Sequence, residues 1–264
     1  MNAKAPSIGF VGGGRITAIL LSALARNPGV AVRAVVSDSD PEVRRRLLSR
    51  FPGLAVGTDN MEPARQDVVF LALHAPALRK AVPEIVGALT PSAVVVSLAP
   101  IVTLAELSRL LGGFARVVRM IPNAPSLVGD GFNPTAYSPA VTARDREVLA
   151  GIFSAFGRYP EVAEEKLEAY AVLTAMGPTY LWFQLEVLRS LATSFGLTKE
   201  EAEYGLAAMA HGTIRLLLES GLPFAEVEDT VPVKPLAEDA PAIVNAYQTR
   251  LTSLYRKLTG KPNA

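Results

Sequence analysis

Short apolar runs alternate with helical patterns along roughly the first 160 residues of the chain. Residues 67–73 (DVVFLAL) and 93–98 (AVVVSL) are continuously apolar, which suits strands that are buried on both faces of a parallel sheet. Proline or glycine bounds two further segments, as is typical of edge strands. The pattern predicts strands over residues 8–11, 30–37, 67–73, 93–98 and 116–121, and edge strands over 134–139 and 158–162.

Helical periodicity fills the segments between these strands. Asp40 and Pro41 occupy the N-cap and first helical positions of one helix. The sequence TLAE at 103–106 has the form of a capping box, in which two free N–H groups are satisfied reciprocally. Helices are predicted over residues 15–26, 41–51, 76–89 and 103–111. Alternating strands and helices of this kind predict an α/β fold with a parallel sheet.

The pattern changes at Glu164, after which strand signals nearly vanish. Gly196 and Gly221 directly follow helical patterns, where helix-ending glycines belong. Pro178 interrupts the first pattern, and its missing N–H should kink or open the helix near Thr174. Long helices are predicted over residues 166–195, 199–220 and 239–259. We therefore expect a parallel-sheet domain over 1–163 and an all-helical domain over 164–264.

Composition excludes several classes of function. Of the 264 residues, 50% are hydrophobic and 19% are charged, and the formal net charge is +1. This balance is typical of a compact globular protein and gives no electrostatic reason to expect nucleic acid or an anionic membrane as a partner. The chain has no cysteine, which excludes disulfides, thiolate catalysis and cysteine-bound zinc. Its two histidines, His74 and His211, are far apart, and no metal site is predicted.

Glycine, proline or charge breaks the apolar stretches before they reach the ~20 residues that a membrane helix needs. Residues 1–7 carry one lysine and no long apolar core, so we interpret them as a short tail rather than a signal peptide. A cytoplasmic protein without a membrane partner is the expectation.

A glycine-rich turn follows the first predicted strand and opens the first predicted helix. In this context Gly12 permits a tight turn, and Gly14 lets backbone N–H groups approach a dinucleotide pyrophosphate at the helix N-terminus. Arg15 could add a phosphate contact, and Ile16 lies beside it. Thr17 departs from the dinucleotide fingerprint, which has its third glycine at this position. A tight turn without a ligand is the alternative interpretation.

The end of the second predicted strand bears on the choice of coenzyme. An acid such as Asp38 can bind the 2′-hydroxyl of NAD and would repel the 2′-phosphate of NADP. Serine hydroxyls such as that of Ser37, with Arg44 or Arg45 in reach, could instead hold that phosphate. Alternatively, Asp38 and Asp40 cap the next helix. The residues themselves leave NADP and NAD open.

Several segments together resemble the pyrroline-5-carboxylate reductase family. The most specific is 119–131 (RMIPNAPSLVGDG), which is similar to the family's RxMPNxPxxVGxG. The segments are residues 8–14, 67–73, 97–104, 119–131, 177–180 and 217–221. The resemblance spans nearly the whole chain. It implies a Rossmann domain followed by a helical dimerisation domain, and hydride transfer from NADPH to a cyclic imine.

The departures from the family pattern fall on the substrate side. The family's SGSGP stretch is TAMGP here, with a hydroxyl kept at Thr174. The family's SPGGTT loop, which contacts the substrate through hydroxyls and backbone, is replaced by VKPLAE at 233–238. Lys234 could replace the lost anion-binding donors by charge. Glu238 would repel a carboxylate substrate if it entered the pocket.

Cofactor contacts are expected where strands end, because open α/β sheets place ligands at that edge. Asn123 is bracketed by prolines and is either a contact to nicotinamide or substrate, or a turn residue. His74, at the position of a family lysine, either touches the adenosine side of the cofactor or is an exposed loop histidine. The expected cofactor contacts are Gly12, Gly14, Arg15, Ile16, Ser37, Asp38, Leu73, His74, Ala99, Pro100 and Asn123. The candidate catalytic residues are Thr174, Lys234 and Glu238.

The resemblance predicts an NAD(P)H-dependent reductase of C=N bonds that acts on a small molecule, with NADPH as cofactor and NADH as the second option. Carbonyl reduction, as in β-hydroxyacid dehydrogenases, is the alternative among enzymes. Those enzymes resemble the first half of this chain but use a lysine on the helix between their domains, and Lys166 lies too near a predicted helix start to fit that role. A non-catalytic NADP-binding sensor or partner protein is the third hypothesis, motivated by the altered loop 233–238. A homodimer through the C-terminal helices is expected, although a monomeric bundle would fit the same amphipathic pattern.

Overall fold

The computed structural model describes residues 5–29 and 33–260 and divides the chain into two compact units. The first unit comprises residues 1–176 and 255–264, and the second comprises 177–254. The sequence pattern places 164–176 in the helical domain, whereas the structure groups this segment with the first unit. The division between the units therefore lies after Met176 instead of after residue 163.

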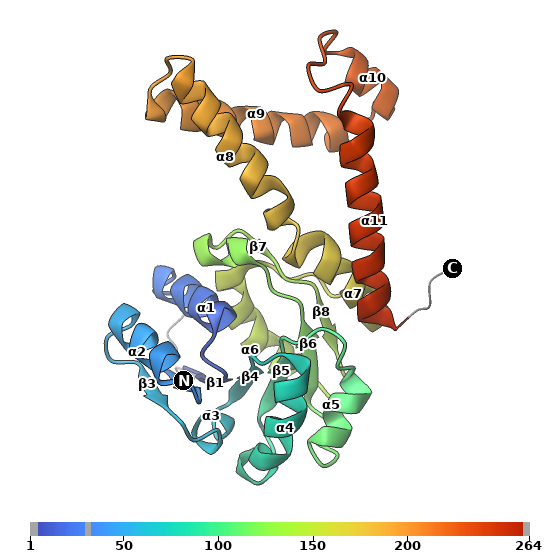
Figure 1. Cartoon of the computed structure of the whole chain (residues 1–264). Coiled ribbons are helices and arrows are strands. Elements are labelled where there is room, and N and C mark those ends of the chain that lie inside the picture. The colour runs from blue at the N-terminus through green and yellow to red at the C-terminus, as the bar shows by residue number, and fades with distance from the viewer. Residues whose placement is uncertain (1–4, 30–32, 261–264) are drawn as a thin grey trace. The chain divides into compact units, whose positions relative to one another are not determined.

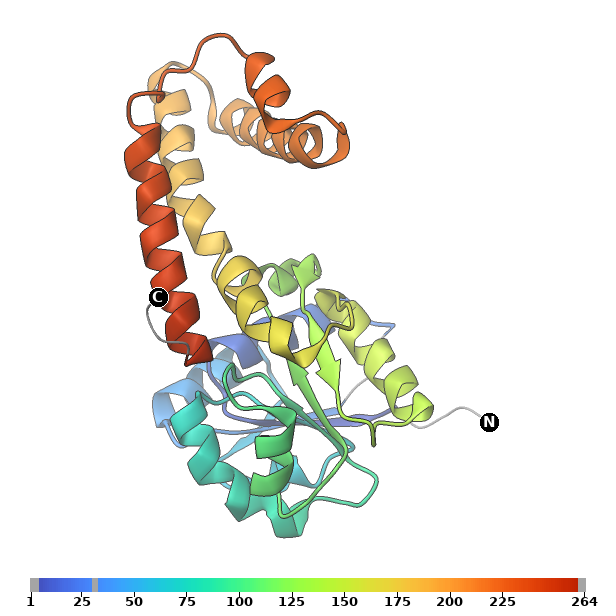
Figure 2. The same ribbon diagram turned by 90° about the vertical axis from the view of Figure 1, so that its right-hand side faces the viewer.

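A seven-stranded sheet lies at the centre of the first unit (Figures 1 and 2). Its strand order is β3-β2-β1-β4-β5-β6-β8, and all neighbouring strands are parallel except β6 and β8. The strands are β1 (Ser7–Val11), β2 (Arg33–Ser37), β3 (Ala55–Gly57), β4 (Val68–Leu71), β5 (Val94–Ser97), β6 (Val117–Met120) and β8 (Thr135–Tyr137). Because β1 pairs with both β2 and β4, the strand order reverses there, as in a Rossmann sheet.

The predicted strands of this sheet are confirmed, with some differences at its margins. Residues 30–32 of the second predicted strand, and 1–4 of the predicted tail, lie outside the described residues. Segment 134–139 contains the edge strand β8, as predicted. Segment 158–162 contributes only Arg158 to a strand, β9 (Gly157–Arg158), which pairs with β7 (Gly131–Phe132) in a separate two-stranded sheet. Pro160 has no N–H for a ladder, so the strand does not continue.

Helices cover both faces of the sheet, which explains why the central strand β4 is apolar at every position. Val68 and Phe70 pack on one face with α1, α2 and α6, whereas Val69 and Leu71 pack on the other with α4 and α5. The helices of this unit are α1 (Arg15–Arg26), α2 (Pro41–Arg50), α3 (Met61–Ala64), α4 (Ala75–Ile85), α5 (Leu104–Leu110) and α6 (Ala143–Phe153). The fold is therefore the predicted α/β architecture, and α3 and α6 are additions to it.

Two predicted helix caps are present, one of them in a changed form. The side chain of Asp40 accepts a hydrogen bond from the Glu42 N–H at 2.8 Å, as an N-cap does. The Thr103 hydroxyl accepts from the Glu106 N–H at 3.1 Å, which is half of the predicted capping box. The other half is not made, because the Glu106 carboxylate accepts from Arg79 on α4 at 2.7 Å. Glu106 therefore joins two helices instead of closing its own.

The segment after residue 163 belongs to the first unit because its apolar side chains pack against residues of the sheet. Leu167 and Ala171 form a buried cluster with Ile121 and Ala136, and Leu258 packs against the same cluster. The segment consists of a 3₁₀ turn (Glu164–Lys166), α7 (Leu167–Tyr170) and a π-helical turn (Ala171–Ala175). The predicted continuous helix over 166–195 is thus interrupted just before Pro178, in agreement with the opening that this proline predicts.

The second unit consists of helices with little core of their own. It contains α8 (Pro178–Ser194), α9 (Lys199–Glu219), α10 (Phe224–Asp229) and most of α11 (Ala240–Thr259). Gly196 and Gly221 have φ values of +98° and +74°, which confirms them as helix-ending glycines. Ala202 is the one buried hydrophobic residue in this unit among the residues that the structure describes. Across the described ranges, no helix is long and apolar enough to cross a membrane.

Candidate nucleotide-binding site

The turn between β1 and α1 requires glycine at position 12. Gly12 has φ +101°, and its N–H donates to the Ser37 carbonyl on β2 at 2.8 Å. A Cβ atom at this position would lie 2.6 Å from the Ala72 carbonyl oxygen beyond β4. Left-handed backbone and close contact both exclude a side chain, so the sequence prediction of a tight glycine turn is confirmed here.

Thr17 accounts for the departure from the three-glycine fingerprint. Its side chain has no exposed surface, and its hydroxyl donates to the Gly12 carbonyl at 2.6 Å. The threonine thus stabilises the glycine turn from inside the first turn of α1. A hydrogen bond replaces the close helix–strand packing that a glycine would permit at this position.

The N-terminus of α1 is open to a ligand. Gly14 is its N-cap residue, so no side chain caps the helix, and the first turn contains no acidic residue. A Cβ atom built on Gly14 meets nothing within 4 Å. Arg15 is exposed beside it, and Ile16 is half-buried. Free N–H groups, the helix dipole and a cation therefore favour an anion at this point.

The end of β2 is tied to the glycine turn by Asp38. One carboxylate oxygen accepts from the Gly13 N–H at 2.7 Å, and the other accepts from the Asp40 N–H at 2.8 Å. The guanidinium of Arg44, on α2, reaches this loop and donates to the carbonyls of Asp38 and Ser39 at 2.8 and 2.9 Å. The acid and the cation that bear on coenzyme choice are therefore close together, one in the loop after β2 and the other on α2.

Ser37 is placed differently from its predicted role. It has no exposed surface, and its hydroxyl donates to the Asn60 side chain at 2.7 Å. Its carbonyl accepts from Gly12, as described above. Ser37 therefore supports the turn from beneath, and the structure gives no surface of it to a cofactor.

The remaining predicted cofactor residues follow three strands that are neighbours in the sheet. Leu73 and His74 come after β4, Ala99 and Pro100 after β5, and Asn123 after β6. Because these strands are parallel, their carboxyl ends lie along one edge, next to the glycine turn after β1. His74 is exposed at the N-cap of α4 without a side-chain cap bond, whereas Ala99 is buried and presents backbone.

Asn123 brings two predicted site residues together. Its Nδ2 donates to the Thr174 carbonyl at 3.3 Å, and its Oδ1 accepts from the Phe132 N–H at 3.0 Å. The Thr174 carbonyl is the one that Pro178 cannot serve, because proline has no N–H to donate four residues back. The Thr174 hydroxyl donates to the Tyr170 carbonyl at 2.9 Å. Asn123 therefore holds β7 and the π-helical turn together through its side-chain hydrogen bonds. With 7% of its surface exposed, it also stays a candidate contact to the cofactor.

Lys234 and Glu238 lie on the second unit, in the segment between α10 and α11. Both residues are exposed, and the Lys234 carbonyl accepts from the Ala237 N–H at 3.1 Å. The segment has no regular secondary structure over 231–234, as the proline-rich sequence predicts. The substrate roles of these two residues stay predictions.

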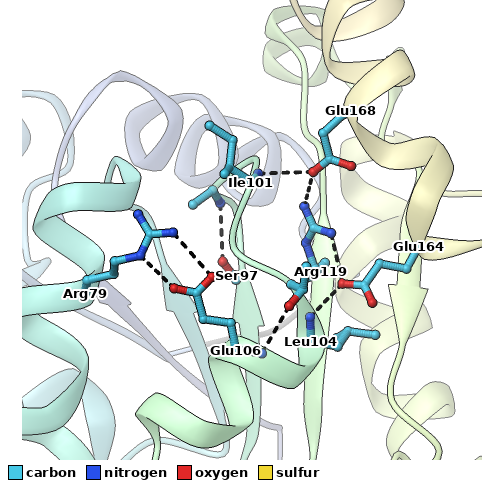
Figure 3. Close-up of polar contacts among 10 residues, drawn as sticks. Arg79, Ser97, Ile101, Leu104, Glu106, Arg119, Glu164 and Glu168 are labelled. Atoms are coloured by element: carbon cyan, nitrogen blue, oxygen red, sulfur yellow. Dashed lines mark hydrogen bonds and ion pairs between the residues drawn. The ribbon is translucent and has the colours of Figure 1, made fainter. Parts of the chain in front are cut away.

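Two features near this edge are absent from the sequence prediction (Figure 3). Arg119 on β6 is buried and forms ion pairs with Glu164 at 2.9 Å and Glu168 at 2.6 Å. Ile101, in the loop after β5, has φ +79° and donates its N–H to Glu168 at 3.1 Å. The motif around Arg119 is a sequence signal for the arginine. Nothing in the sequence indicates a left-handed isoleucine, because that conformation is unfavourable for β-branched residues.

Comparisons with known proteins agree with this geometry. Residues 7–100 match the family model described as NADP oxidoreductase coenzyme F420-dependent. The chain is 27% identical over 226 residues to the pyrroline-5-carboxylate reductase of Escherichia coli (strain K12), covering 85% of this chain and 84% of that protein. It is 29% identical over 219 residues to that of Corynebacterium melassecola, covering 81% of each.

Solved structures agree with these relatives. The pyrroline-5-carboxylate reductase of Coxiella burnetii matches with a TM-score of 0.72 and 26% identity, over 99% of this chain and 100% of that one. The pyrroline carboxylate reductase of Plasmodium falciparum, solved with NADP bound, matches with a TM-score of 0.76 over 97% and 96% of the two chains. At 19% identity the second match bears on the fold alone. By its motifs, its fold and these relatives, the chain is similar to pyrroline-5-carboxylate reductases, and residues 7–100 match an NADP oxidoreductase family.

Proposed function

We propose that the protein binds NADPH along the carboxyl ends of its parallel strands and uses it to reduce the C=N bond of a small cyclic imine. The observation that carries the proposal is the uncapped N-terminus of α1, which faces open space beside the left-handed Gly12 turn. It lies where the strand order reverses, the usual site of a dinucleotide pyrophosphate. The curated relatives are named for reduction of pyrroline-5-carboxylate, which supports an imine as substrate.

NADP is favoured over NAD by the loop after β2. Both oxygens of Asp38 already accept backbone N–H groups, so this carboxylate is engaged in holding the loop. The Arg44 guanidinium, which donates to the carbonyls of this loop from α2, offers positive charge for a 2′-phosphate. NAD stays the second option, because a carboxylate oxygen can accept a further hydrogen bond from a ribose hydroxyl.

Bound NADPH would supply the hydride, and the protein's residues would orient the reactants and exclude water. The Thr174 hydroxyl is a candidate proton donor to the imine nitrogen, which requires that it turn away from the Tyr170 carbonyl. Lys234 is a candidate partner for an anionic group on the substrate, and Glu238 would select against such a group. No metal is required by this chemistry, and across the described ranges no cluster of metal-binding side chains is found.

The first experiment follows NADPH oxidation by the purified protein with pyrroline-5-carboxylate and repeats it with NADH. Turnover with NADPH supports the proposal, and a preference that shifts toward NADH in Arg44→Ala supports the coenzyme assignment. Turnover with small keto acids but not with imines would instead indicate a carbonyl reductase. Tight NADPH binding without any turnover would indicate a cofactor-binding protein that is not an enzyme.

A Gly14→Asp variant tests the binding site itself. The new side chain points into open space and is a favoured N-cap, so α1 should keep or gain stability. Its charge occupies the place of the pyrophosphate, and NADPH binding should fall by more than tenfold. Gly87→Asp, which adds the same charge at another open position, is the control and should bind as the wild type does.

We also propose that the second unit pairs with that of a second copy of the chain. Large apolar side chains are exposed along α8 and α9, among them Phe183 at 63% and Leu218 at 73%. Exposed large apolar side chains that are this frequent on two helices favour an interface. Light scattering should give the mass of a dimer for the wild type and of a monomer for Leu218→Glu. Leu48→Glu, which places the same charge on the first unit, should stay dimeric, and a monomeric wild type would contradict the proposal.

A further inference from the structure

Arg119 is held between two carboxylates that also bind the loop after β5 (Figure 3). Its side chain is 1% exposed. One oxygen of Glu168 accepts from Arg119 at 2.6 Å and from the Ile101 N–H at 3.1 Å. One oxygen of Glu164 accepts from Arg119 at 2.9 Å and from the Leu104 N–H at 2.6 Å. A single buried cation thereby fixes the acceptors of two backbone N–H groups, one in the loop after β5 at Ile101 and one at Leu104, the first residue of α5.

The loop contains an unfavourable backbone conformation at one of these two points. Ile101 is the one non-glycine residue with positive φ in the part of the chain that the structure describes. A left-handed conformation brings Cβ close to the carbonyl oxygen, and β-branching makes the contact worse. Such a conformation persists only where the surroundings hold it, and here Glu168 binds the N–H of the strained residue itself.

The position of this loop connects the strain with the nucleotide site. Ala99 and Pro100 precede Ile101 directly and follow β5, between the strand ends of β4 and β6. The Ile101 side chain is 41% exposed, although its backbone is tied to buried groups. The glycine turn lies beyond β4 in the strand order, so the β5 loop is the part of the edge farther from the pyrophosphate site.

We propose that Arg119 and Glu168 are positioning residues that hold Ile101 in its left-handed conformation and so shape residues 99–104 to receive the nicotinamide half of the cofactor. This inference rests on the proposed function, because it assumes a dinucleotide at the strand ends. It assigns the α7 carboxylate a role in cofactor binding without contact to the cofactor. Glycine at position 101 would adopt the same conformation without the strain.

The test measures NADPH dissociation constants by calorimetry for the full-length protein. Glu168→Ala removes the acceptor of the Ile101 N–H, and binding should weaken about tenfold, which corresponds to about 1.4 kcal/mol. Glu168→Gln keeps the side-chain volume and a weaker acceptor, so its NADPH affinity should lie between those of the wild type and Glu168→Ala. It replaces Glu168→Ala in the test if that variant does not fold. Glu161→Ala loses an exposed ion pair with Arg146 and should bind as the wild type does.

Rescue distinguishes positioning from general destabilisation. Adding Ile101→Gly to Glu168→Ala should restore most of the lost NADPH affinity, because glycine adopts the left-handed conformation without a hydrogen bond to Glu168. Loss of affinity that Ile101→Gly does not relieve would overturn the proposal, as would unchanged binding in a folded Glu168→Ala protein. If the wild type binds no dinucleotide, the proposed function fails and the positioning role fails with it. Hydrogen exchange of the Ile101 amide, measured without cofactor, then tests whether Glu168 holds this N–H, since Glu168→Ala should accelerate the exchange.

Discussion

At the scale of single residues, the glycine turn depends on a threonine that its motif does not contain. The Thr17 hydroxyl serves the carbonyl of Gly12, which is itself buried. A fingerprint glycine at 17 would leave that carbonyl without this donor and would place a flexible residue in the first turn of α1. The departure from the motif is thus compensated within the same turn.

Thr17→Val should lower the free energy of unfolding by ~1–3 kcal/mol, because it keeps the shape and leaves a buried carbonyl unpaired. Urea denaturation monitored by circular dichroism measures the change. Thr17→Ser keeps the hydroxyl and should be the milder variant. A valine protein as stable as the wild type would show that the carbonyl finds another donor.

The ion pair of Glu106 with Arg79 makes a contribution to the free energy of unfolding that depends on pH, and its sign follows from the pKa shift. The hydrogen bond from Arg79 lowers the pKa of the Glu106 carboxyl, in opposition to the effect of burial. A lowered pKa in the folded state stabilises the protein at neutral pH, and this contribution disappears as the pH falls through that pKa. Glu106→Gln should therefore cost less than about 1 kcal/mol at pH 7, as expected for a partly exposed pair. Thermal melts should show the difference vanishing in acid, and a difference that persists there would contradict the assignment.

At the scale of elements, the break between α7 and α8 supplies a hydrogen-bond acceptor to the site. The π-helical turn Ala171–Ala175 precedes Pro178, and the Thr174 carbonyl accepts a hydrogen bond from the Asn123 side chain. Turns of this kind occur often at functional sites. One side chain therefore connects β6, β7 and the helical segment.

Asn123→Ala should destabilise the protein by about 2 kcal/mol or more, because it leaves both the Thr174 carbonyl and the Phe132 N–H without their partner. Asn123→Asp keeps an acceptor for Phe132 but places a carboxylate against the Thr174 carbonyl, and it should not restore stability. Chemical denaturation of both variants measures this. If Asn123→Ala were as stable as the wild type, the structural role of Asn123 would be contradicted and only its role as a cofactor contact would be left.

Local signals in the sequence predict the elements well and the long-range contacts poorly. Helix α1 matches its predicted range, and α9 ends within one residue of its own, because glycines and periodicity mark both. Asn123 and Thr174 each have a local signal, a proline-bracketed turn and a helix-breaking proline. The bond between them joins residues 51 positions apart and has no local signal. The left-handed Ile101 depends likewise on a carboxylate 67 positions away.

At the scale of the whole molecule, the two units differ in how much of their surface they bury. The first unit has a large hydrophobic cluster on each face of its sheet and a smaller one around Leu167 and Ala171. In the second, among described residues, only Ala202 is a buried hydrophobic residue, and side chains such as Phe195 are 78% exposed. A unit with so small a core needs further burial for its stability.

The proposed dimer makes stability depend on concentration. The Tm of the wild type should rise as protein concentration is raised, because association draws the equilibrium toward the folded state. The monomeric Leu218→Glu protein should melt at a lower temperature that does not change with concentration. Calorimetric scans over a range of concentrations measure both. A wild-type Tm that does not depend on concentration would contradict an obligate dimer.

The return of the chain to its first unit has a consequence for biosynthesis. Leu258, in the last turn of α11, packs on the cluster that contains Leu167 and Ala171, although Leu258 follows Ala171 by 87 positions in the chain. While the ribosome is still translating the second unit, this patch of the nucleotide-binding unit has no cover. We therefore expect the nascent chain to expose this apolar patch until α11 emerges, and a chain truncated before Tyr255 to keep it exposed and to aggregate more readily.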